Sequence, residues 1–202
     1  MTVPARIVLA SANPKKVAEL RDVLAAAFGD AVELVPRPDD VADVVEDAPD
    51  FVGNAKLKAV ALCAATGEAA LADDSGLEVD ALGGAPGVRS ARFAGDDATD
   101  DDNVDLLLAE LLRLGATDRD DRTARFRCVL VLRYPDGTEL VADGTVEGWI
   151  TGARHGTNGF GYDPVFVPRD GDGRTFAQMA SEEKHAISHR GRALERLTAS
   201  LR

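Results

Sequence analysis

ALADDSGLEVDALGGAPGVRSARFAG, residues 70–95, contains a short apolar run that leads into two adjacent aspartates, Asp73 and Asp74. Ser75 and Gly76 follow, and this pair predicts a sharp turn at the end of a strand. Because successive side chains of a strand point to opposite faces, the two carboxylates cannot both face one core. Adjacent carboxylates raise each other's pKa unless a cation intervenes, and Mg²⁺ prefers oxygen ligands. The segment therefore predicts either a solvated acidic turn or a metal site in a cleft.

The composition is that of a globular protein with no polyanionic partner. The chain has 202 residues, 45% hydrophobic and 29% charged, enough for one domain with a sizeable core or two small lobes. Its formal net charge of -12 repels nucleic acid polymers. No apolar run has the length of a membrane span or of a secretory signal. Cys63 and Cys128 lie far apart in apolar sequence, as buried thiols do in a reducing compartment. We therefore expect a cytoplasmic protein that binds neither nucleic acid polymers nor membranes.

Apolar patterns and turn signals predict alternating strands and helices. Ala5–Ala10 is typical of a buried strand, and a helix follows that begins at Pro14, with Asn13 as its cap and Gly29 as its end. Further patterns predict a strand at 32–35, a helix at 51–66, a helix capped by Thr99 that ends before Gly115, and a long antiparallel hairpin from strands at 124–134 and 138–146. This order describes an α/β or α+β protein with a mixed central sheet and flanking helices. We expect one domain over residues 1–202, with two lobes around a cleft.

Most basic residues of the chain are arginines, and the few lysines are unevenly distributed. All the lysines fall in three short segments, at Lys15, Lys16, Lys56, Lys58 and Lys184. Lysine is a compact charge that arginine does not replace at a tight phosphate site. The first segment, Ser11–Lys16, also lies at a predicted helix N-terminus, where free N–H groups and the helix dipole favour an anion. Chance clustering and an ordinary capped helix are the alternatives.

Two later segments are also unusual. Gly156–Phe166, GTNGFGYDPVF, combines glycines with Phe160 and Tyr162. Such a loop can wrap a planar ring, although plain turns share this composition. Near the C-terminus, Ser188 is expected to cap the last helix, which places His189 and Arg190 in its first turn.

Taken in order, SANPKK, Glu46, NAKLKA, residues 70–95, GFGYDPVF and EKHAISHRG resemble the inosine triphosphate pyrophosphatase family, the non-canonical purine nucleoside triphosphate pyrophosphatases. These motifs span Ser11 to Gly191. Two positions depart from the family pattern: Gly53 stands where relatives often have Glu, and Asn158 replaces a glycine. The resemblance implies Mg²⁺-dependent hydrolysis of ITP, dITP and XTP to the monophosphate and pyrophosphate, by a homodimer. A pyrophosphatase for other modified nucleotides and a nucleotide-binding sensor without turnover are the alternatives.

The resemblance also implies roles for individual residues. Glu46, Asp73 and Asp74 would surround the Mg²⁺, and Asp74 would orient or deprotonate the attacking water. Lys16 and Lys184 would hold phosphates, with Lys56 as a further cation. The expected substrate-binding residues are Ser11, Ala12, Asn13, Pro14, Lys15, Lys16, Ser75, Phe160, Gly161, Tyr162, Asp163, Lys184, His189 and Arg190.

The purine base would be recognised by the aromatic loop and by the start of the last helix. Phe160 can stack on the ring, while Asp163, His189 and Arg190 can address its hydrogen-bonding edge. A donor such as Arg190 aimed at the 6-oxo group would favour hypoxanthine and xanthine, and would leave the 6-amino group of adenine mispaired.

Overall fold

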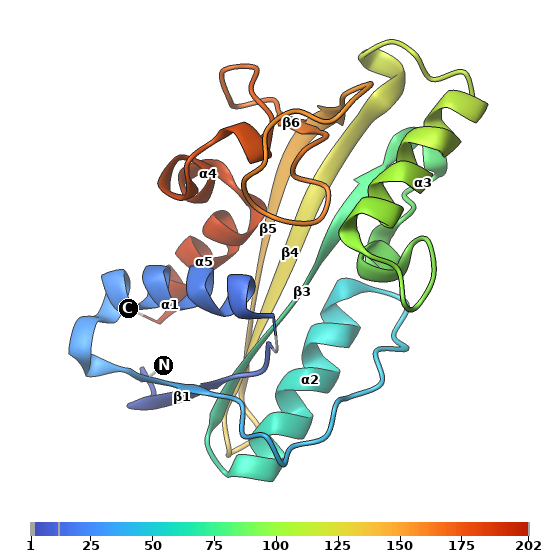
Figure 1. The fold of residues 1–202 in the computed structure, drawn as a ribbon. Helices are drawn as coiled ribbons and strands as arrows, with labels where there is room; N and C mark the ends of the chain where they lie inside the picture. The colour runs from blue at the N-terminus through green and yellow to red at the C-terminus, as the bar shows by residue number, and fades with distance from the viewer. Residues whose placement is uncertain (1–2, 12, 202) are drawn as a thin grey trace. The chain divides into compact units, whose positions relative to one another are not determined.

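The computed structural model describes residues 3–11 and 13–201, and over these residues it contains one six-stranded sheet flanked by helices (Figure 1). The strand order is β2-β1-β3-β4-β5-β6. The strands are β1 (Arg6–Leu9), β2 (Glu33–Pro36), β3 (Ala69–Val79), β4 (Thr123–Arg133), β5 (Glu139–Ile150) and β6 (Phe166–Pro168). β1 pairs in parallel with β2 and β3, whereas β5 and β6 are antiparallel. The predicted α/β class with a mixed sheet is therefore confirmed.

The α-helices are α1 (Pro14–Phe28), α2 (Phe51–Thr66), α3 (Asp100–Arg113), α4 (Ser181–Ile187) and α5 (His189–Ser200). Among the described residues, none of the helices is both long enough and apolar enough to cross a membrane. The chain divides into two compact units, the first made of residues 1–74, 128–144 and 190–202, the second of residues 75–127 and 145–189. The expected cleft between two lobes stays a prediction.

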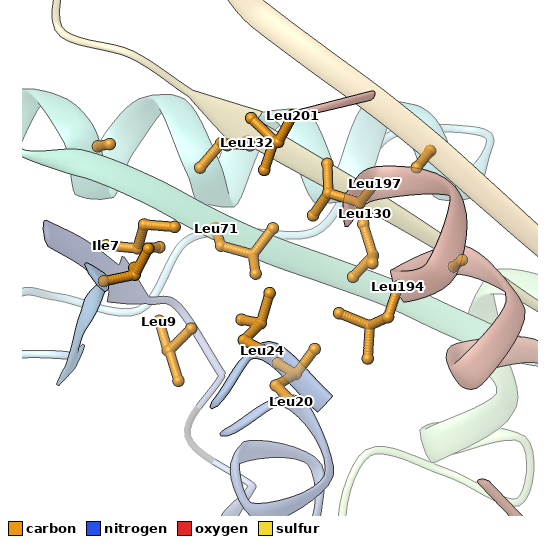
Figure 2. Close-up of a cluster of buried hydrophobic side chains, with 14 of the residues drawn as sticks. Ile7, Leu9, Leu20, Leu24, Leu71, Leu130, Leu132, Leu194, Leu197 and Leu201 are labelled. Atoms are coloured by element: carbon orange, nitrogen blue, oxygen red, sulfur yellow. The ribbon is translucent and has the colours of Figure 1, made fainter. Parts of the chain in front are cut away.

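The core of the first unit lies between its sheet and the helices α1 and α5. Leu20 and Leu24 of α1, Leu194 of α5 and Leu71 of β3 are at most 1% exposed and belong to one cluster (Figure 2). Burial of each such side chain contributes about 1.5–3 kcal/mol. This apolar contact holds the polar N-terminal ends of both helices near the middle of β3.

The second unit has its own core, which is rich in aromatic rings. Phe126 of β4 meets Phe166 of β6 edge to face, with ring centroids 4.7 Å apart, and lies 6.0 Å from the ring of Phe176. Leu77 of β3 and Leu107 of α3 are fully buried in the same cluster. Tyr162 and Val165 of the aromatic loop at residues 156–166 belong to the same cluster, so the loop is packed against this core.

Two sequence predictions about strand ends are wrong. The chain does not turn at Ser75 and Gly76, because β3 runs on from Ala69 to Val79 with both aspartates buried. Because cationic residues distant in sequence balance the charges of the two aspartates, the strand continues through them although they are buried. β5 likewise continues beyond residue 146, because Gly148–Ile150 pairs with β6, a strand that the sequence analysis did not predict.

Candidate active site

Asp73 lies on the face of β3 that packs against α1 and α5. Its Oδ2 is 3.1 Å from Lys16 Nζ and 3.6 Å from Arg190 Nη2. Arg190, which is 1% exposed, also donates to Glu19 of α1. Burial disfavours the charge on Asp73, but Lys16, Arg190 and Lys58 outweigh it and hold the pKa of Asp73 far below its ordinary value. Asp73 is therefore ionised at neutral pH and contacts two cations.

Asp74 points to the opposite face of β3, where α2 lies. Its Oδ2 accepts a hydrogen bond from Asn54 Nδ2 at 3.2 Å, and its Oδ1 is 3.5 Å from Lys58 Nζ. Lys58 also donates to Glu46 Oε2 at 2.9 Å. Burial raises the pKa of Asp74, and Glu46 adds to that effect, so the pKa stays above its ordinary value although Lys58 lowers it. A carboxylate whose pKa is raised is a stronger base than an ordinary one.

The two neighbouring aspartates thus face different partners and have opposite pKa shifts. The sequence-based expectation that one of them must lie in water or a cleft is wrong in its first part, since both are less than a tenth exposed. Each carboxylate is instead compensated by at least one lysine, which is the condition for burying a charge.

Lys58, and not Lys56, is the lysine of α2 at this site. Lys56 Nζ lies 2.8 Å from Glu139 Oε2 and its side chain is half exposed, so the expectation that it is a further site cation is not supported by its contacts. Asn54 and Lys58 are separated by four residues and therefore lie on one face of the helix. That spacing was the signal in the sequence that distinguishes Lys58 from Lys56.

The carboxylates of Glu46 and Asp74 both contact the same ammonium group, and such a pair of oxygen ligands suits Mg²⁺. Both carboxylates converge on Lys58 Nζ, and oxygen ligands are what a hard divalent cation requires. Asp73 contacts Lys16 and Arg190 instead. Within residues 3–11 and 13–201, no three His, Cys, Asp or Glu side chains form a group that could hold a metal ion. A magnesium site thus stays a prediction, with two of the three expected ligands facing one charge.

The N-terminus of α1 is capped by the chain itself. Asn13 Oδ1 accepts from the amides of Lys15 at 3.0 Å and of Lys16 at 3.4 Å, and the Asn13 amide donates to Ser11 Oγ at 3.3 Å. This confirms Asn13 as the cap and Pro14 as the first helical residue. Ala12, also expected at the phosphates, lies outside the described residues. Phosphate binding by this segment stays a prediction.

In the second unit, Asp163 organises the aromatic loop. Its Oδ2 accepts from Lys184 Nζ at 2.6 Å and from the Phe160 amide at 2.9 Å, and both charged side chains are buried. Lys184 Nζ also lies 4.8 Å from the centroid of the Phe160 ring. Gly159 makes this fold-back possible, because a Cβ there would lie 2.0 Å from Asp163 Oδ2 and the φ angle is +76°. The expected base-binding and phosphate-binding residues of this unit are thus in direct contact.

Other parts of the second unit hold the same loop. The Gly161 amide donates to Asp100 Oδ2 at 2.8 Å, and Tyr162 Oη donates to the Ser90 carbonyl at 2.9 Å. Asp100 lies in the first turn of α3, where the helix dipole also favours a carboxylate, and its contact with the loop was not predicted from the sequence. His189, at the start of α5, stacks on Phe126 with ring centroids 4.8 Å apart. Ser75 is half-buried in the part of β3 that belongs to this unit.

The expected site residues therefore form two sets, one in each unit. The first unit holds two aspartates on opposite faces of one strand, each with its own cations, and the second holds the Lys184–Asp163 salt bridge next to the ring of Phe160. Carboxylates and lysines are residue types that can take up protons and stabilise charge on phosphate oxygens.

The model of the Ham1 family matches residues 7–200, and the chain belongs to that family. It is similar to the dITP/XTP pyrophosphatase of Streptomyces avermitilis, with 48% identity over 98% of this chain and 97% of the relative. A HAM1 protein from Coxiella burnetii has a similar structure, with a TM-score of 0.88, 41% identity, and coverage of 100% of this chain and 98% of that one. The nucleoside-triphosphatase, or dITP/XTP pyrophosphatase, of Mycobacterium abscessus gives a TM-score of 0.76 at 47% identity, covering 95% and 98% of the two chains.

Proposed function

We propose that this protein hydrolyses the non-canonical purine nucleoside triphosphates dITP, ITP and XTP to the monophosphate and pyrophosphate. The observation that carries the proposal is the identity of 48% to a dITP/XTP pyrophosphatase along almost the full length of both chains. The contacts of Asp74 support it independently, because they provide a buried carboxylate of raised pKa next to a lysine. Removal of such nucleotides keeps them out of the precursor pool for nucleic acids.

Asp74 is the proposed general base. It takes a proton from water as the water oxygen bonds to the α-phosphorus, and the bond from that phosphorus to the bridging oxygen breaks to release pyrophosphate. Asn54 fixes one oxygen of the carboxylate and the raised pKa strengthens the base. Asp73 is unsuited to this role because its pKa is depressed, and we assign it to holding Lys16 and Arg190 in place.

The charge of the phosphates requires cations. We propose that Lys16, Lys58 and Lys184 bind phosphate oxygens, where fixed positive charge stabilises the leaving pyrophosphate. Mg²⁺ held by Glu46 and Asp74 would neutralise charge on the same oxygens. The convergence of both carboxylates on Lys58 Nζ supports that choice of ligands.

Recognition of the base is assigned to the second set and to Arg190. Phe160 stacks on the purine, and Asp163 and His189 address its polar edge, as the sequence analysis expects. Arg190 would have to share its guanidinium with Glu19 and Asp73, which it contacts in this structure.

We further propose a cytoplasmic homodimer, since dimers are the commonest oligomers and both cysteines are buried thiols.

The test is an assay with Mg²⁺ on ITP, dITP, XTP, ATP and GTP that measures pyrophosphate and orthophosphate separately. We expect pyrophosphate from the first three, much slower release from ATP and GTP, and loss of turnover in Asp74→Asn. Orthophosphate as the primary product would mean cleavage at the terminal phosphate and would contradict the proposal. Equal release from all five substrates would leave the reaction standing and remove the assigned base recognition.

A further inference from the structure

Asn54 joins two parts of the first unit that are distant in sequence. It lies in the first helical turns of α2 and is fully buried. Its Oδ1 accepts from the Ala48 amide at 3.0 Å, while its Nδ2 donates to Asp74 Oδ2 at 3.2 Å. A backbone N–H can only donate and an ionised carboxylate can only accept, so these two partners fix the orientation of the side-chain amide uniquely.

The segment that Asn54 holds is the one that carries Glu46. Ala48 is two residues beyond Glu46, and Glu46 in turn contacts Lys58, one helical turn after Asn54. Lys58 contacts Asp74 as well. Glu46 and Asp74 are therefore joined twice, once through the charge of Lys58 and once through the amide of Asn54.

Gly53 allows this approach of the loop to the helix. A Cβ at Gly53 would lie 2.5 Å from the Ala48 Cβ, a distance that real side chains do not adopt. The Gly53 amide also donates at 2.7 Å to Asp50, the cap of α2. The chain between β2 and α2, which Figure 1 shows without regular structure, is thus tied to the helix through Asn54, a residue that also contacts Asp74.

We infer that Asn54 is a positioning residue for the reaction, which sets the rotamer of Asp74 and the distance of Glu46 from it. This inference rests on the proposed function for its effect on turnover. Without the amide, Asp74 loses a partner for one oxygen, and the loop that carries Glu46 loses its bond to the helix. Outer partners that orient reacting or metal-binding groups typically change activity by about 10–100-fold when they are removed.

The experiment compares Asn54→Ala with Asn103→Ala. Asn103 is a matched control, because it too is buried on a helix and holds a loop, accepting from the Ala94 amide at 2.8 Å and donating to the Ala91 carbonyl at 3.2 Å. For each variant we would measure kcat and KM for ITP with saturating Mg²⁺, the Mg²⁺ concentration at half-maximal rate, and amide hydrogen exchange of the peptide at residues 44–50.

Asn54→Ala is expected to lower kcat about 10–100-fold with a small change in KM, and to speed exchange at Ala48. Asn103→Ala should lower thermal stability and leave kcat unchanged. Unaltered kcat in Asn54→Ala, or an equal loss in Asn103→Ala, would overturn the inference. If the parent protein releases no pyrophosphate from any substrate, the proposed function fails. In that case hydrogen exchange still tests the structural part of the inference: unaltered exchange at Ala48 in Asn54→Ala would show that Asn54 does not hold the loop.

The variant Asn54→Asp distinguishes the effect of the hydrogen bond to Ala48 from the effect of the hydrogen bond to Asp74. It keeps an oxygen for the Ala48 amide but faces Asp74 with a like charge and no donor. We expect slow exchange at Ala48 together with reduced kcat. Full activity in this variant would show that the contact with Asp74 has no positioning role.

Discussion

Replacing Asp73 by asparagine would remove the charge that Lys16 and Arg190 share inside the first unit. Loss of one partner from a buried ion pair costs about 3–5 kcal/mol, because the other charge stays buried without compensation. The side chain of Lys16 is 20% exposed and can reach water, and Arg190 keeps Glu19, so we expect the lower end, about 3 kcal/mol. For a chain of this size each kcal/mol lowers the Tm by about 2–4 °C, hence by about 6–12 °C for Asp73→Asn.

The assay is thermal and urea unfolding of the parent, Asp73→Asn and Asp143→Asn. Asp143 is a fair control, since it pairs with Arg196 at 3.1 Å in the same unit but both side chains are more than half exposed. Such a surface pair contributes at most about 1 kcal/mol. If Asp73→Asn destabilises the protein no more than Asp143→Asn does, the buried charge network described for Asp73 is wrong.

The loss of stability in Asp73→Asn should depend on pH. The folded pKa of Asp73 lies below the unfolded pKa of about 3.9, so its stabilisation is fully present above that value and is lost as the pH falls below it. The difference in unfolding free energy between the parent and Asp73→Asn should therefore shrink between about pH 5 and pH 3. A difference that stays constant over this range would show that lost packing, and not lost charge, is responsible.

Three further results are expected. Lys58→Met should reduce kcat by at least about 10-fold, while Lys56→Met should have little effect. Equal effects of the two changes would contradict the assignment of Lys58, and not Lys56, to the site. Gly159→Ala should raise KM, because its Cβ would displace the Asp163 carboxylate, whereas Gly173→Ala, which shares a positive φ but meets no atom within 4 Å, should not. In the protein without Mg²⁺, Asp74 should titrate at a higher pH than an ordinary aspartate, because burial disfavours its charge; an Asp74 carboxyl that titrates at or below about pH 3.9 in an NMR titration would contradict the environment described for it.

Elements with local signals could be predicted closely from the sequence. α1 begins at Pro14 after its Asn13 cap, and α2 spans Phe51–Thr66 and is followed by Gly67, as the capping and stop residues indicate. α5 begins directly after Ser188. Caps work because they satisfy backbone groups within a few residues of the helix end, so the relevant physics is present in a short window of sequence.

Features decided by distant partners could not be predicted in this way. The course of β3 through Ser75 depends on Lys16 and Lys58, which neutralise the two aspartates from helices on either face. Asp100 could be recognised as a favourable charge for α3, but its bond to the Gly161 amide joins segments that are 61 positions apart. Asn54 was quoted only as part of a motif, and its two hydrogen bonds become visible when the loop and β3 are placed around it.

The alternation along β3 has a consequence for the specificity of folding. If the strand slipped by one residue relative to its neighbours, every side chain would change faces, yet each face would still receive one carboxylate because the two aspartates are adjacent. The distribution of charge alone therefore does not distinguish the observed register of β3 from a register shifted by one residue. Side-chain volume does distinguish them, because Leu71 fills the cluster beneath α1 and α5 while Ala70 and Ala72 occupy the opposite face. The placement of Asp73 and Asp74 on their respective faces of β3 thus depends on the apolar side chain of Leu71.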